Sequence, residues 1–124
     1  MTKYFYDTYA IIEFINGNPV FKEYFLENEG ITTLYNAMEV YYIILRDQNE
    51  EKAKTALNLL KQILVSSSIN LVEDAMKFRL KHRLMKIKFS YADCLGYIVS
   101  LKEKIKFLTG DEGFKNLPNV EFVK

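Results

Sequence analysis

The sequence predicts an α/β fold in which helices surround a mostly parallel sheet of about five strands. Two observations carry this prediction. Short apolar segments alternate along the chain with helical segments of about ten or more residues, which is the pattern of repeated strand–helix–strand units. No stretch rich in proline, glycine or serine divides the 124 residues, and this length suits a single domain over 1–124.

The predicted strands are short apolar runs bounded by turn residues or by the start of a helix. In chain order they are 3–7, 30–34, 67–72, 106–110 and 120–123. The first strand ends at Asp7, and the fourth ends at Thr109-Gly110, directly before Asp111. Both runs therefore end in a carboxylate.

The predicted helices have apolar residues at helical spacing and recognisable ends. In chain order they are 8–16, 19–28, 35–47, 50–65, 73–87 and 91–105. Asn16-Gly17 ends the first helix, and Pro19 suits the first turn of the second. The segment 50–65 has the clearest amphipathic pattern, and Ser90 suits the N-cap of the last helix.

Composition narrows the classes of function. Apolar residues make up 49% of the chain, and 17 basic against 16 acidic residues leave a net charge of +1, so no overall field calls for a polyanionic partner. The single Cys94 and single His82 exclude an internal disulfide, a cysteine-based zinc site and any mechanism that needs two histidines. The N-terminus lacks a signal-peptide pattern and the apolar run 40–45 is too short for a bilayer, so we expect a cytoplasmic protein without membrane association.

Four acidic residues lie at element tips or among apolar neighbours. Asp7 and Asp111 each follow a predicted strand, where ligands bind in open α/β sheets. Glu39 and Asp93 lie on predicted helices between apolar residues, and a carboxylate buried there needs a partner or a cation. Taken singly, each acid also suits a turn, a cap or an exposed position. Taken together, they offer only oxygen ligands, which select hard cations such as magnesium or manganese.

Three segments carry a resemblance to a known family. "FYDTYAIIEF" places Asp7 between a strand and a helix, "TTLYNAMEVYYIILR" carries Glu39, and residues 90–123 carry Asp93 and Asp111. In the order and spacing of these segments the chain resembles a PIN-domain ribonuclease, and its size is similar to that of a VapC-type toxin of a toxin–antitoxin pair. One departure is Asn36, one turn before Glu39, where relatives often carry a small hydroxyl residue.

The resemblance implies a three-layer α/β/α fold and metal-dependent hydrolysis of RNA to products with 5′-phosphate and 3′-hydroxyl ends. The catalytic acids, which would bind Mg²⁺ or Mn²⁺, are Asp7, Glu39, Asp93 and Asp111. Thr8 and Thr109 would be the hydroxyls that support them. The implied partners are an RNA substrate, a VapB-like antitoxin and a second copy of the chain in a homodimer.

A basic segment over 77–88 surrounds His82. Its cations are Lys77, Arg79, Lys81, Arg83, Lys86 and Lys88. They form either a solvated helix face or a row of contacts to RNA phosphates, and the sequence does not separate these two interpretations. We expect Met76, Leu80 and Leu84 on the buried side of this helix, and His82 on its surface.

Functions outside this class have weaker support. A receiver-like signalling domain also has acids at strand tips, but it needs adjacent acids after the first strand, whereas Asp7 stands alone. A PIN fold retained as a binding or scaffold module is opposed by the intact set of four acids. A PIN nuclease that processes RNA outside a toxin system would have much the same sequence.

Overall fold

The computed structural model describes all 124 residues and contains one sheet of five strands. The strands are β1 (Lys3–Tyr6), β2 (Glu29–Thr33), β3 (Leu64–Val65), β4 (Lys106–Thr109) and β5 (Val120–Phe122). Their order across the sheet is β3-β2-β1-β4-β5, and every neighbouring pair is parallel. The predicted α/β class with a parallel sheet of about five strands is confirmed.

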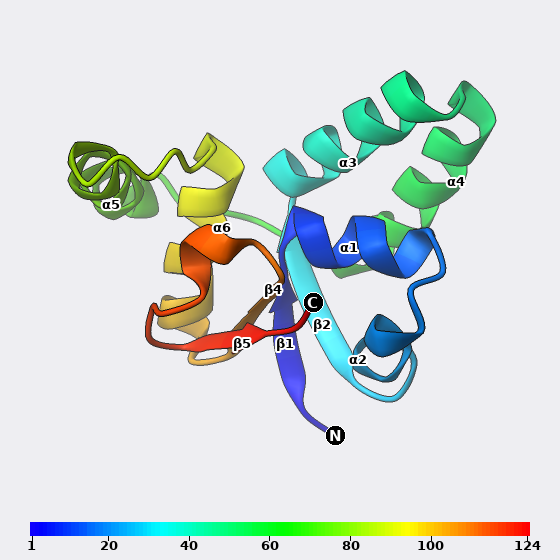
Figure 1. Cartoon of the computed structure of the whole chain (residues 1–124), viewed down its shortest axis with the longest axis horizontal. Helices are drawn as coiled ribbons and strands as arrows, with labels where there is room; N and C mark the ends of the chain where they lie inside the picture. The colour runs from blue at the N-terminus through cyan, green and yellow to red at the C-terminus, as the bar shows by residue number, and fades with distance from the viewer.

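Helices cover both faces of the sheet. They are α1 (Thr8–Ile15), α2 (Lys22–Leu26), α3 (Leu34–Asp47), α4 (Glu50–Leu60), α5 (Asn70–Leu84) and α6 (Tyr91–Glu103). In Figure 1, α1 to α4 lie on one side of the sheet, and α5 and α6 lie on the other. Two buried clusters match these layers: along β1, Tyr4 and Tyr6 join the cluster of α1 to α4, and Phe5 joins the cluster of α5 and α6. The fold is therefore a three-layer α/β/α arrangement.

The third strand lies earlier in the chain than predicted. The prediction at 67–72 is wrong, because β3 pairs with the end of β2 and the later residues enter α5. Helix α4 ends at Leu60, and one 3₁₀ turn over Lys61–Ile63 then brings the chain to the sheet edge. Ile69 and Val72, which made the later segment resemble a strand, are exposed around the start of α5. An edge strand of two residues carries too little periodicity to be recognised.

Helix α5 buries only part of the predicted face, because Met76 is partly buried against the core but the two leucines are not. Leu80 and Leu84 are exposed, whereas His82 is buried. His82 Nδ1 bonds to the Phe78 carbonyl at 2.8 Å, and the two rings lie 4.1 Å apart. Phe78 also stacks on Phe89, 5.4 Å away. These aromatic contacts fix the orientation of α5 and place His82 in the interior. The prediction of a surface histidine was therefore wrong.

The strand order reverses direction at the centre of the sheet. The chain leaves β1 toward β2 on one side, whereas β4 pairs with β1 on the other side. This is the point in an open α/β sheet where ligands bind beyond the carboxyl ends of the strands. The N-termini of α1, α3 and α6 come together above the ends of β1 and β4 (Figure 1). None of the helices has the length and hydrophobicity needed to cross a bilayer.

Candidate active site

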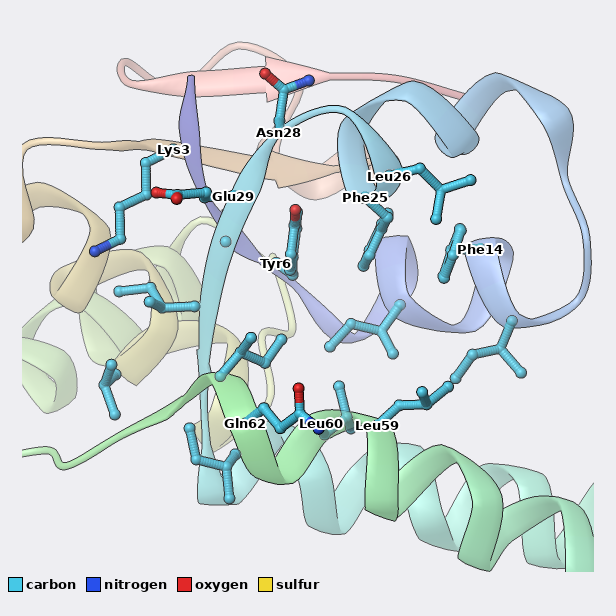
Figure 2. Close-up of a pocket in the computed structure, with 17 residues that line it drawn as sticks. Lys3, Tyr6, Phe14, Phe25, Leu26, Asn28, Glu29, Leu59, Leu60 and Gln62 are labelled. Atoms are coloured by element: carbon cyan, nitrogen blue, oxygen red, sulfur yellow. The ribbon is translucent and has the colours of Figure 1, made fainter. Parts of the chain in front are cut away.

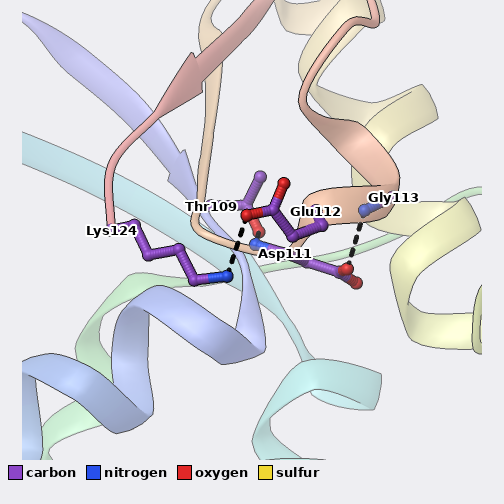
Figure 3. Close-up of polar contacts among 5 residues, drawn as sticks. All are labelled: Thr109, Asp111, Glu112, Gly113 and Lys124. Atoms are coloured by element: carbon purple, nitrogen blue, oxygen red, sulfur yellow. Dashed lines mark hydrogen bonds and ion pairs between the residues drawn. The ribbon is translucent and has the colours of Figure 1, made fainter.

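The tips of β1 and β4 position the first two acids. Asp7 follows β1, and its amide donates to the Leu108 carbonyl of β4 at 3.1 Å. Thr109 Oγ1 donates to Asp7 Oδ2 at 2.7 Å and accepts from the Asp111 amide at 3.1 Å. Asp111 Oδ1 in turn accepts from the Gly113 amide at 3.0 Å (Figure 3). One buried hydroxyl thus links the two strand-tip acids.

The surroundings of Asp7 strongly disfavour a charged carboxylate. Its side chain is 1% exposed, and its Oδ1 atom is buried without a hydrogen-bond partner. Burial raises the pKa of Asp7 well above its ordinary value; repulsion from Asp93 and, more weakly, from Asp111 adds to this shift, and hydrogen bonds from Thr109 and the Thr8 backbone oppose it. A buried carboxylate oxygen without a partner costs free energy that a bound cation would offset. Asp7 therefore fits a cation ligand.

Glu39 is held by a buried polar network at the start of α3. Its Oε1 atom accepts from Thr8 Oγ1 at 2.7 Å. Asn36 Nδ2 donates to the same Thr8 hydroxyl at 3.1 Å, and Asn36 Oδ1 accepts from Thr33 Oγ1 at 2.6 Å. The amide of Asn36 thus supplies a supporting hydrogen bond where relatives often carry a hydroxyl. Sequence reasoning missed Thr33, although two adjacent threonines at the end of a buried strand were a signal for such a network.

Asp93 both caps its own helix and faces the other acids. Ser90 and Asp93 form a capping box, in which the Ser90 amide donates to Asp93 Oδ2 at 2.8 Å and the Asp93 amide donates to Ser90 Oγ at 3.0 Å. Burial raises the pKa of Asp93 to about 6, with repulsion from Glu39 and Asp111 in the same direction and the Ser90 hydrogen bonds opposing it. Asp93 Oδ1 accepts no hydrogen bond within the protein and remains available to a ligand.

The four acids share one neighbourhood. Repulsion couples Asp7 to both Asp93 and Asp111, and it couples Asp93 to Glu39 and to Asp111. No three acidic, cysteine or histidine side chains stand close enough to hold one ion as a finished cage. Magnesium does not require such a cage, because it typically binds through one or two carboxylates and completes its shell with water and substrate phosphate. The oxygen donors and the unpartnered Asp7 Oδ1 therefore fit a hard divalent cation.

Two further acids near these segments, Glu112 and Glu13, make contacts outside the four-acid cluster. Glu112 adjoins Asp111, but its side chain is exposed and its Oε1 atom lies 3.0 Å from Lys124 Nζ (Figure 3). This ion pair lowers the pKa of Glu112. Glu13 accepts a hydrogen bond from Asn18 at the far end of α1. Neither acid takes part in the hydrogen bonds that hold the four-acid cluster.

The basic segment divides into one half-buried cation and five exposed ones. None of the six forms an ion pair with an acid of the protein. The half-buried member is Arg79, whose Nε donates to the Phe89 carbonyl at 3.2 Å. Its guanidinium carbon lies 4.4 Å from the ring centroid of Tyr91, at the start of α6. Contact between these cations and RNA stays a prediction.

A large cavity lies apart from the acids. Figure 2 shows this space of about 670 Å³ between α1, α2, β2 and the end of α4. Its lining is mainly apolar, with Phe14, Phe25 and Leu60 among its residues, and none of the four acids lines it. The cavity offers no cluster of groups for acid–base or metal chemistry. The four carboxylates therefore remain the candidate site.

Comparison with solved structures identifies the fold. VapC20 of Mycobacterium tuberculosis, a Sarcin–Ricin loop cleaving toxin, matches with a TM-score of 0.80 at 18% identity, covering 95% of this chain and 97% of that one. DNA-bound VapBC from Salmonella typhimurium gives 0.77 at 15% identity, with 99% and 98% covered. A toxin–antitoxin complex from Klebsiella pneumoniae gives 0.72 at 17% identity, with 94% of each chain covered. At these identities the likeness shows a shared fold.

Sequence comparison identifies the family. The sequence has no significant match among curated proteins. The model of the PIN domain family, in contrast, matches residues 4–120. Because this match spans nearly the whole chain, the protein belongs to the PIN domain family, as its sequence motifs indicate.

Proposed function

We propose that this protein is a divalent-metal-dependent endoribonuclease that acts through Asp7, Glu39, Asp93 and Asp111. The observation that carries the proposal is Asp7, whose buried Oδ1 has no partner and whose charge is repelled by Asp93 and Asp111. Carboxylates with strongly perturbed pKa values that act on one another are typical of functional sites. Membership of the PIN family and the fold shared with an RNA-cleaving toxin support RNA as the substrate.

The chain's own groups hold the acids ready for a cation. The Thr109 hydroxyl fixes one oxygen of Asp7, and the Thr8 hydroxyl fixes one oxygen of Glu39. The cap of α6 fixes one oxygen of Asp93. The second oxygens of Asp7 and Asp93 then remain to bind Mg²⁺ or Mn²⁺. A cation held there would stabilise charge on the phosphate oxygens and lower the pKa of the attacking water. One of the four carboxylates would orient that water, and hydrolysis would leave 5′-phosphate and 3′-hydroxyl ends.

A toxin role in a VapBC-type pair is the biological setting that we propose. Two of the matched structures are of toxin–antitoxin or VapBC complexes, and the present chain shares its fold with them over 94% or more of its length. The partners would be a VapB-like antitoxin and a second copy of the chain in a homodimer. A cytoplasmic location goes with this role, because the proposed RNA substrate and antitoxin would be encountered there.

The nuclease proposal is tested by cleavage of a fluorescent single-stranded RNA. We expect cutting by the wild type with manganese, and loss of cutting with a chelator or with Asp93→Asn. The asparagine keeps an oxygen that accepts from the Ser90 amide, so α6 retains its cap. Asp74→Asn, on an exposed part of α5, is the matched control and keeps full activity.

Two results would contradict parts of the proposal. A folded wild-type protein that cuts no RNA and binds no manganese by calorimetry would remove the nuclease function and favour the scaffold alternative. The toxin role has its own test in growing cells, where wild-type protein should arrest growth and Asp93→Asn should not. Cleavage in vitro without growth arrest would instead favour a PIN nuclease that processes RNA.

A further inference from the structure

One aromatic ring is exposed at the start of α6, the helix that carries Asp93. Tyr91 is the first residue of α6, two residues before Asp93, and it is 63% exposed. The neighbouring rings of Phe89, Tyr97 and Phe114 are all buried. The Tyr91 hydroxyl makes no hydrogen bond within the protein. Packing therefore does not account for a large ring at this position.

A cation covers one face of this ring. The Arg79 guanidinium lies 4.4 Å from the ring centroid, and its Nε is held by the Phe89 carbonyl. The terminal nitrogens of Arg79 make no hydrogen bond to the protein, so they remain free to donate. Arg79 thus supports one face of the Tyr91 ring, and the residue remains 63% exposed. A ring held in this way loses little freedom when a flat ligand binds.

The stacked pair belongs to the same framework as the acids. Phe89, which holds Arg79, stacks on Phe114 with ring centroids 4.2 Å apart. Phe114 ends the 3₁₀ turn that begins directly after Asp111. A ligand on the Tyr91 ring would therefore lie at the same end of α6 that carries Asp93.

We infer that Tyr91, backed by Arg79, stacks an unpaired base of the RNA next to the phosphate that the carboxylates receive. This inference rests on the proposed function and names the residue that would hold a base of the RNA beside the cleaved bond. Four carboxylates repel a polyanion, and Arg79, together with Lys86 and Lys88 exposed between α5 and α6, supplies compensating positive charge. An aromatic face backed by arginine is a typical support for an unstacked base and tolerates any base identity.

The test uses a single-stranded RNA that carries one 2-aminopurine, whose fluorescence falls when the base stacks. Binding is measured with manganese on Asp93→Asn protein, which prevents cutting. Tyr91→Phe, introduced into the Asp93→Asn protein, keeps the ring and should keep both the quenching and the affinity. Added Tyr91→Leu keeps the bulk without the ring, so quenching should disappear and Kd should rise by about 5- to 160-fold.

Two controls separate stacking from a general loss of binding. Tyr42 on α3 is 61% exposed and also lies under an arginine, with the Arg46 guanidinium 5.6 Å from its ring centroid. Tyr42→Leu should leave quenching and Kd unchanged. Pairing the RNA with a complementary strand buries its bases in a duplex, so the difference between Tyr91→Phe and Tyr91→Leu should vanish. Thermal unfolding confirms that each variant is folded.

The possible results distinguish this inference from the proposed function. RNA binding that is equal in Tyr91→Leu and Tyr91→Phe overturns the inference, even where the wild type cuts RNA. Tyr91-dependent quenching together with a wild type that never cuts supports the base platform and overturns the nuclease proposal. A folded protein that neither binds nor cuts RNA overturns both.

Discussion

The acid at the tip of β1 and the acids on the helices are held in different ways. Asp7 is fully buried, and one of its oxygens has no partner. Glu39 and Asp93 are half-buried, and each accepts a hydrogen bond from a group close by in α1 or at the helix cap. The sheet thus places a charge where water cannot screen it, whereas the helices bring charges with local support. We expect the strand-tip acid to dominate cation binding.

The largest effect is expected for Asp7→Asn. The substitution removes the carboxylate charge from the centre of the cluster and keeps its shape, so cleavage should fall by more than about 100-fold, beyond what loss of an outer supporting group usually causes. Initial rates on single-stranded RNA with manganese measure this effect, and circular dichroism confirms the fold. Activity within tenfold of the wild type would show that Asp7 is not the central ligand.

The pH dependence of stability compares the two kinds of acid directly. Asp93 has an ordinary pKa of 3.8 that burial raises to about 6 in the folded protein. Between these values the folded state binds more protons than the unfolded state, so the stability from this group is present below pH 3.8 and is lost as pH rises through about 6. The loss amounts to on the order of 3 kcal/mol.

Urea unfolding of metal-free protein between pH 4 and 8 measures this loss. The free energy of unfolding of Asp93→Asn should fall less with rising pH than that of the wild type, because an amide does not titrate. Asp7→Asn should flatten the decline as well, since the pKa of Asp7 is also raised. Parallel curves for the wild type and both variants would contradict the pKa shifts.

The next largest effect is expected when the Thr109 hydroxyl is removed. Thr109→Val keeps the side-chain shape but removes the group that joins Asp7 to the Asp111 amide. Manganese affinity, measured by calorimetry, should fall by about 10- to 100-fold, as is common for groups that orient metal ligands. Thr55→Val is the control, because the exposed Thr55 hydroxyl bonds only to a carbonyl of its own helix. A change in manganese affinity below threefold in Thr109→Val would show that this hydroxyl does not support cation binding.

The smallest effect is expected on the helix side. Asn36→Ala removes the hydrogen bonds to Thr8 and Thr33 and should lower the free energy of unfolding by about 1–3 kcal/mol. Manganese affinity should fall by less than about tenfold, because Thr8 still reaches Glu39. Asn36→Ser restores a small hydroxyl and should recover part of both losses. A greater loss of affinity than in Thr109→Val would reverse the ranking of the two sides.

The sequence predicted the centre of the fold better than its edge. β1 and β4 are buried on both faces, so they appear as apolar runs that end at Asp7 and just before Asp111. β3 has only two residues, and its position depends on where α4 ends. The rotation of α5 depends on the packing of Phe78 and His82 against α6 and the segment before it, which the spacing of leucines does not reveal.

The candidate site divides in a similar way. The acids and the two threonines could be named from short motifs, because each lies within a few residues of an element end. Their role as metal ligands stays a prediction. The Asn36 network and the stacking of Arg79 on Tyr91 join residues that only the tertiary structure brings together. Such contacts leave no periodic trace in the sequence.

Calorimetric titration of manganese into the folded wild type and Asp7→Asn tests the central claim most directly. The account predicts binding to the wild type with release of protons, seen as a heat that differs between two buffers, because raised carboxyl pKa values leave protons for the cation to displace. Asp7→Asn should bind manganese at least about 100-fold more weakly, in line with its lost cleavage. A folded wild type that binds no manganese, or a variant that binds it equally well, would contradict a cation site built on these carboxylates.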